Sequence, residues 1–120
     1  MTSALNSFGA IFAFAIDLEA KLRDYYQTAG SADSAGACEK RRANLERVRR
    51  ENVTEIKLEP IEGLNEADFV LNLADTSETG WRANHSAAAR FYEAAAPKIN
   101  VREAQRALER CAKQHLALTV

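Results

Sequence analysis

Few side chains in this sequence could do chemistry by themselves. The chain has two cysteines, Cys38 and Cys111, and two histidines, His85 and His115. A cysteine nucleophile needs a positioned base, and His115, four residues after Cys111, is the one evident candidate. We interpret Cys111 as a small core side chain instead. The sequence contains no glycine-rich phosphate loop, no cysteine pair with metal-ligand spacing and no serine nucleophile motif.

An internal repeat singles out further polar residues. Glu19 precedes the tyrosine pair at residues 25–26 by the same spacing with which His85 precedes the Phe-Tyr pair at 91–92. The segments that follow also align, with LERVRREN at residues 45–52 beside LERCAKQH at 108–115. Such self-similarity indicates that the chain contains two related helix pairs.

Four segments have the spacing of helices packed in a bundle. In the first, third and fourth, the inward-facing side chains recur at alternating intervals of four and three residues, and the second carries Cys38, Leu45 and Val48. This spacing predicts helices over residues 3–28, from the turn at 31–36 to 52, over 77–96, and from 101 to 118. Pro97 ends the third helix. The expected capping residues are Asp33 or Ser34 for the second helix, and Asn100 with Glu103 for the fourth.

Between the second and third helices, the helical period disappears from residue 53 to residue 76. Residues 54–58 alternate between polar and apolar as in an extended chain, and Pro60 interrupts the segment. We expect a long crossover here. Within it, a short helix begun by Asn65 would hold the apolar residues 69–71 against the bundle as a lid.

These elements predict the fold class. The chain of 120 residues, 47% of them hydrophobic, has the length of a single domain. Two helical hairpins joined by a long crossover make a ferritin-like connection rather than a simple up-down bundle. We therefore predict one all-α domain over residues 1–120, a ferritin-like four-helix bundle with a long crossover between its second and third helices.

The repeat resembles the rubrerythrin branch of the ferritin-like superfamily. In that family a Glu lies seven residues before an aromatic-Tyr pair on the first and third helices, and the second and fourth helices each supply Glu-x-x-His to a di-iron site. The resemblance assigns two of these ligand positions to Glu19 and His115. The other four positions depart from the family and carry His85, Arg49, Asn52 and Ala112.

These departures imply a degenerate site rather than a di-iron centre. One carboxylate cannot balance the charge of two iron ions, and the Arg49 guanidinium would add positive charge where the metals should lie. Glu19, His85 and His115 could still hold one divalent ion, Fe, Mn or Zn, with open positions. We favour the alternative that Glu19 pairs with Arg49 inside the bundle. The histidines would then hydrogen-bond to Asn52 or to a tyrosine hydroxyl.

Three functions are compatible with such a site. The first, which we favour, is a non-catalytic ferritin-like domain that acts by self-association or by binding a protein partner. The second is a mononuclear metal-binding protein, or a non-haem metal oxidoreductase, that uses Glu19, His85 and His115. The third is a small-molecule binder that uses the space vacated by the metals.

The charge composition gives no reason to expect nucleic acid or membrane as a partner. The 16 basic and 17 acidic side chains nearly cancel. Residues 40–50 are rich in Lys and Arg, but Glu39, Glu46 and Glu51 are interspersed among them. We therefore interpret this helix face as solvated and salt-bridged.

The cellular location follows from the hydropathy of the first helix. The apolar run at residues 8–16 is shorter than the ~20 residues of a membrane span and has no basic leader. We expect a cytoplasmic protein. Its sparse cysteines, Cys38 and Cys111, are then expected to stay reduced.

The first helix carries more apolar surface than one helix of a bundle needs. Its seam through Phe8, Phe12 and Ala15 faces the bundle centre, so Phe14 projects away from the centre. The crossover could cover this second surface within the same chain. We favour a symmetric partner, because self-association commonly places the same patch of both subunits in contact. The prediction is a homodimer with Phe14 in its interface.

Overall fold

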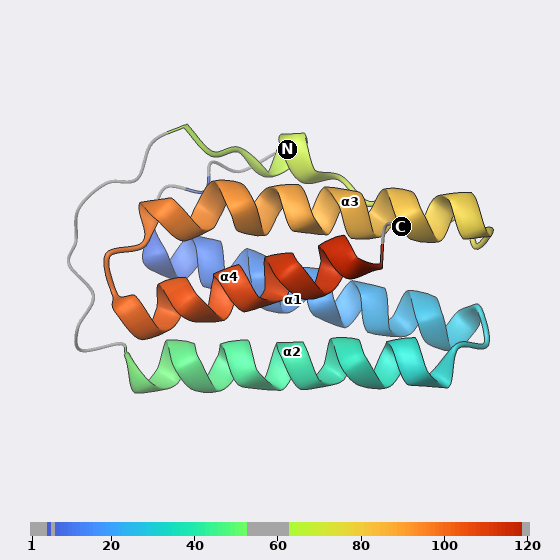
Figure 1. Ribbon diagram of the computed structural model, residues 1–120, viewed down its shortest axis with the longest axis horizontal. Coiled ribbons are helices and arrows are strands. Elements are labelled where there is room, and N and C mark those ends of the chain that lie inside the picture. Colours follow the sequence, from blue (N-terminus) through green and yellow to red (C-terminus); the bar gives the residue numbers. More distant parts are fainter. Residues whose placement is uncertain (1–4, 6, 53–62, 119–120) are drawn as a thin grey trace.

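The computed structural model describes residue 5 and residues 7–52 and 63–118 (Figure 1). Its elements are α1 (Phe8–Thr28), α2 (Ala32–Glu51), η2 (Glu66–Phe69), α3 (Glu78–Ala95), η3 (Ala96–Lys98) and α4 (Arg102–Ala117). The predicted all-α class is confirmed, since these described ranges contain helices and no strand. None of the described helices is both long enough and apolar enough to cross a membrane.

Serine side chains fix where α1 and α3 begin. The Ser7 hydroxyl accepts a hydrogen bond from the Ala10 N–H at 3.0 Å, and the Ser77 hydroxyl accepts one from the Gly80 N–H at 3.3 Å. Each bond satisfies a backbone donor that has no partner within the helix. The first helix therefore begins at Phe8 and not at residue 3, whereas the third begins close to the predicted position.

The predicted caps of α2 and α4 are wrong. Ser31 precedes α2, so Asp33 lies inside the first turn of that helix. Val101 precedes α4 and provides no side-chain cap. Asn100 is one residue too early for a capping box with Glu103, because the box needs its first residue at the N-cap position.

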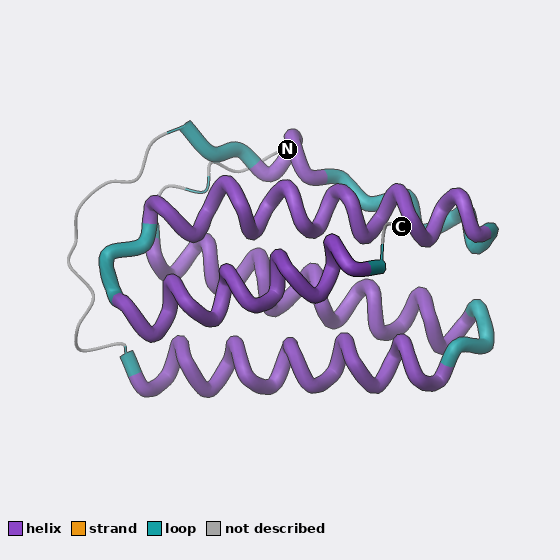
Figure 2. Tube along the Cα trace, in the orientation of Figure 1, coloured by secondary structure: helices purple, strands orange, loops and turns teal. Residues whose placement is uncertain are grey.

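Two antiparallel hairpins, α1–α2 and α3–α4, build the bundle (Figure 1). The colours of Figure 1 show that α2 and α3 both end at the left side of the view, so these two helices point the same way. Residues 63–77 run along the outer side of α3 (Figure 2). The alternating residues 54–58 lie outside the described residues. The largest fully buried side chains include Tyr26, Tyr92, Phe12, Phe91, Ile11, Leu22, Leu45 and Leu108.

The predicted lid is formed by η2 and the residues after it, with two of the expected three side chains, Phe69 and Leu71, packed against the core. Phe69 is buried, and its ring lies 5.5 Å from that of Phe91 and 6.5 Å from that of Phe14. Leu71 is partly buried, whereas Val70 is 70% exposed and does not cover the bundle. The surface around Phe14 is thus covered within the same chain, as in the alternative that we did not favour.

A loop packs closely against the start of α3. A Cβ atom on Gly80 would lie 2.2 Å from the Asp75 carbonyl oxygen, so this position requires glycine. Asn84 holds the loop from the next turn, because its side chain accepts from the Asn72 N–H at 2.8 Å and donates to the Asn72 carbonyl at 3.0 Å. The Tyr25 hydroxyl also donates to the Asp75 carbonyl. These contacts tie α1 to the N-terminal half of α3.

The charged face of α2 is salt-bridged as predicted, except at Arg41, which is buried and does not belong to this face. Arg42 pairs with Glu39 and with Glu46, each at 2.7 Å, and Arg47 pairs with Glu51 at 2.6 Å. All three pairs have the spacing of neighbours on one helix face, where each contributes a few tenths of a kcal/mol (about 0.2–0.5). These residues belong to the solvated surface of the bundle.

Candidate functional site: a buried polar chain

Each of the four α-helices places one polar side chain at the centre of the bundle. These are Glu19 of α1, Arg41 of α2, His85 of α3 and His115 of α4, with exposed fractions of 0, 7, 4 and 0%. Buried groups of this kind are tolerated only when other polar groups satisfy them. The hydrogen bonds of this cluster therefore decide what it can do.

Both carboxylate oxygens of Glu19 have partners. The Arg41 Nε–H donates to Oε1 at 2.9 Å, while the Tyr92 hydroxyl and His115 Nε2 reach Oε2 at 2.6 and 2.8 Å. Burial by itself would raise the pKa of Glu19. The hydrogen bond from His115, the charge of Arg41 and the hydrogen bond from Tyr92 together lower the pKa below its usual value. Glu19 is therefore ionised at neutral pH.

The hydrogen-bonded cluster extends from Glu19 through the two histidines. His115 Nδ1 lies 2.8 Å from His85 Nδ1, and His85 Nε2 contacts the Tyr26 hydroxyl. Burial above all, with the nearby charge of Arg41, lowers the pKa of His85 to about 4, so this ring is neutral at neutral pH. One placement of the ring protons satisfies every atom: Tyr26 donates to His85, His85 donates to His115, and His115 donates to Glu19.

Of the two partners predicted for the histidines, the tyrosine hydroxyl is confirmed and Asn52 is not. His85 binds a tyrosine hydroxyl, that of Tyr26, as expected. Asn52 does not take part, because its side-chain amide donates to the Val48 carbonyl at 2.8 Å. Tyr26 and Tyr92 pack in the core, and their hydroxyls also satisfy the buried polar chain.

Arg41 occupies the place that we predicted for Arg49. Arg49 is exposed on the surface of α2, one position beyond the buried Val48. Glu19 and Arg41 each lie eleven residues from Gly30, in the turn of the first hairpin. The two helices of an antiparallel hairpin place such residues side by side, whereas Arg49 lies about 12 Å farther along α2 at about 1.5 Å per residue. The distance of each residue from the turn could have identified Arg41.

Arg41 makes further contacts with polar groups on α2 and α4. Its guanidinium donates to Gln114 Oε1 at 3.0 Å and to the Cys38 sulfur at 3.2 Å. Burial lowers the pKa of Arg41, but the charge of Glu19 and its hydrogen bond outweigh this effect and raise the pKa. Arg41 thus supplies the positive charge that balances Glu19.

The cysteines are free, buried and unreactive. Burial, with the charge of Glu19, raises the pKa of Cys38 to about 11 and that of Cys111 to about 12. Both thiols are protonated at neutral pH and are poor nucleophiles. This agrees with the interpretation of Cys111 as a core side chain.

The structure brings together the three predicted metal ligands, Glu19, His85 and His115, as members of one hydrogen-bond chain. Each ring nitrogen of both histidines already has a protein partner, and the Arg41 guanidinium lies on the carboxylate. A divalent ion would have to displace these bonds and would meet a fixed positive charge. Over residues 7–52 and 63–118, no group of three or more His, Cys, Asp or Glu side chains is arranged to hold a metal ion. The arrangement described does not fit a metal, and metal binding by these residues stays a prediction.

Comparisons of the chain with models of protein families, with curated proteins and with solved structures found no match.

Proposed function

We propose that this chain is a ferritin-like bundle in which a structural polar chain replaces the di-iron centre, and that it acts without catalysis. The observation that carries the proposal is the ion pair between Arg41 and Glu19 at the bundle centre, at 2.9 Å. A positive side chain satisfies the carboxylate there, so the buried polar groups need no cofactor. The protein then functions through its surface, by self-association or by binding a protein partner.

The direction of the helices supports the ferritin-like connection. α2 and α3 point the same way in Figure 1, so the chain must return along the length of the bundle between them. Cys38 and Arg41 lie three residues apart on α2, near the level of Glu19. This is the spacing of Glu-x-x-His, which favours these two positions over Arg49 and Asn52 as the degenerate ligands of the second helix.

The proposed homodimer uses a surface next to Phe14 rather than Phe14 itself. Val70 and Leu73 are 70% and 41% exposed, and they border a cavity of about 210 Å³ between α1 and the η2 segment. Phe14 and Leu18 line the same cavity from α1. Exposed apolar side chains beside such a cavity are typical of a contact surface between proteins.

Metal analysis of the full chain, purified without a chelator, tests the non-catalytic proposal. We expect less than one equivalent of transition metal per chain. Two iron or manganese ions per chain would contradict the proposal. One ion per chain that is lost in His115→Ala would support the second candidate, a mononuclear metal protein using Glu19, His85 and His115, which is favoured by the contact between these three residues.

Light scattering at micromolar concentration tests the homodimer separately. Val70→Asp should convert the dimer into a monomer, because it places a charge in the apolar contact. Ala43→Asp on the exposed face of α2 makes a comparable charge change away from this surface and should leave the dimer intact. A monomeric wild type, or equal effects of both variants, would contradict the proposed interface.

A further inference from the structure

A continuous groove lies between α2 and α4 on the surface of the bundle. It consists of two cavities of about 360 and 450 Å³. Asn44, Ala107 and Arg110 line both cavities, so the two form one groove along the helices. Each volume is within the range of small-molecule binding sites, about 300–1,000 Å³.

Small and polar side chains leave this groove open. Ala37 and Asn44 line it from α2, and Ala107 and Gln114 line it from α4. A packed helix seam would carry large apolar residues at such positions. The space between the two helices is thus available to a ligand.

The groove is strongly basic. Six cationic side chains line it, against the single carboxylate of Glu103; the six are Lys40, Arg41, Arg47, Arg102, Arg106 and Arg110. Arg41 is balanced by Glu19, and Arg47 is paired with Glu51 at 2.6 Å and lies 3.5 Å from Glu103. Among the described residues, no ion pair is formed by the other four, Lys40, Arg102, Arg106 and Arg110.

The three arginines of α4 repel one another. Arg102, Arg106 and Arg110 follow at intervals of four residues, which places them one above the other on one helix face. Like charges at this spacing destabilise a helix, and Arg102 also lies at the N-terminal end, where the helix dipole disfavours cations. An anion in the groove would relieve this repulsion. The row is about 12 Å long at about 1.5 Å per residue, so the matching anion is elongated and carries several charges.

The lining residues indicate the chemical class of this anion. Guanidinium groups bind phosphate oxygens through paired hydrogen bonds, and arginines dominate the row. The residues that line the two cavities include no aromatic side chain on which a nucleobase could stack. We propose that the groove between α2 and α4 binds a linear oligophosphate chain, with Arg106 and Arg110 as its principal contacts. This groove touches the buried polar chain through Arg41 and shares no lining residue with the Val70 surface.

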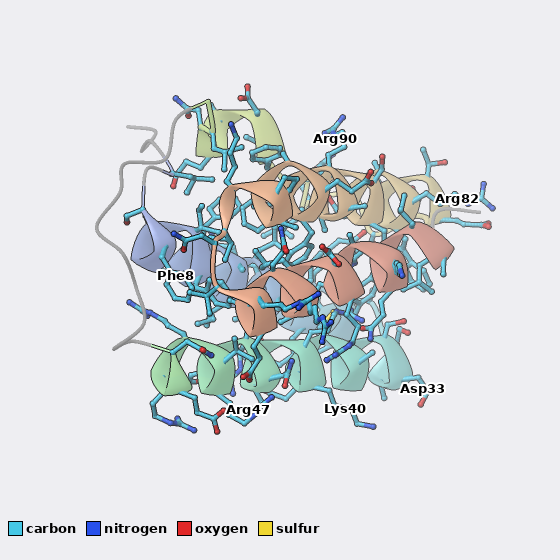
Figure 3. All side chains as sticks on the ribbon, turned by 60° about the vertical axis from the view of Figure 1, so that its left-hand side comes forward. Phe8, Asp33, Lys40, Arg47, Arg82 and Arg90 are labelled. Carbon is cyan, nitrogen blue, oxygen red and sulfur yellow. The ribbon has the colours of Figure 1, made fainter. Side chains whose placement is uncertain are left out.

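Isothermal titration calorimetry of the full chain with inorganic tripolyphosphate tests the proposal. At low ionic strength we expect one binding site per chain, with an affinity that falls as salt is added. Arg106→Gln and Arg110→Gln should each weaken binding about tenfold, the loss expected for a hydrogen bond to a charged group. Both positions are exposed, and circular dichroism checks that the variants fold. Arg90→Gln is the matched control, because Arg90 is exposed on α3, on the opposite side of the bundle from Lys40 and Arg47 of α2 (Figure 3).

The same titration with a nucleoside triphosphate distinguishes the sources of the phosphate chain. Binding no tighter than that of tripolyphosphate assigns free oligophosphate as the ligand, whereas tighter binding assigns a nucleotide, and both support the groove. No binding of tripolyphosphate, or an equal loss in Arg90→Gln and Arg106→Gln, would overturn the proposal. Tighter binding of polyglutamate than of tripolyphosphate would also overturn it, in favour of an acidic protein partner.

Discussion

The replacement of Arg41 by alanine is the most direct test of the buried ion pair. This substitution removes the cation that lies 2.9 Å from Glu19 Oε1 and leaves a fully buried carboxylate with Tyr92 and His115 as partners. Removing one partner of a buried pair typically costs about 3–5 kcal/mol, because the remaining charge stays buried without compensation. For a domain of this size, at roughly 4 °C per kcal/mol, the melting temperature should fall by about 12–20 °C.

Urea unfolding followed by circular dichroism measures this effect, and Arg49→Ala is the matched control. Arg49 is exposed on the same helix, so its replacement should change the free energy of unfolding by no more than about 0.5 kcal/mol. Arg41→Met combined with Glu19→Gln should recover part of the loss of Arg41→Ala, since the double variant has no buried charge. Equal losses in Arg41→Ala and Arg49→Ala would refute the assignment of Arg41 to the centre.

Three further predictions concern His85, the loop before α3 and the lid. As pH falls from about 6.5 to about 4, the free energy of unfolding should drop by up to about 3 kcal/mol. The reason is that His85 becomes protonated in the unfolded chain over this range, whereas burial lowers its pKa to about 4 in the folded chain. Urea unfolding of His85→Gln should show no such drop, and a pH profile equal to that of the wild type would contradict the prediction. Gly80→Ala should destabilise by about 1–3 kcal/mol in thermal melts, whereas Gly9→Ala, which meets nothing within 4 Å, should not destabilise. Phe69→Ala should cost about 3 kcal/mol and increase binding of a hydrophobic dye, and an unchanged dye signal would argue against the lid.

The helices could be predicted from sequence because their evidence is local. The four-three spacing located α1, α3 and α4, the apolar residues after the turn located α2, and Ser77 and Pro97 bounded α3 nearly where expected. The start of α1 was missed because apolar periodicity alone does not identify the N-cap, which a hydrogen bond from Ala10 assigns to Ser7.

The site was only partly predictable because its contacts depend on how the helices align. Glu19, His85 and His115 were identified from the repeat, and the structure brings them together. The repeat compares sequence with sequence, so it selected Arg49, whereas the hairpin turn decides which residue of α2 lies beside Glu19. The coverage of Phe14 by Phe69 likewise comes from a segment with no helical period.

From Tyr26 to Glu19, each group donates a hydrogen bond to the next one. The tautomer of one histidine therefore determines the tautomer of the other. If His115 turned its proton to Nδ1, His85 would have to give up its own Nδ1 proton and carry it on Nε2, against the Tyr26 hydroxyl. Neither histidine can change its tautomer alone, because two donors or two acceptors would then face each other. The ionised Glu19 carboxylate can only accept, so the reversed arrangement would leave His115 Nε2 and Glu19 Oε2 facing each other as two acceptors. Glu19 therefore fixes the direction of every hydrogen bond in the cluster.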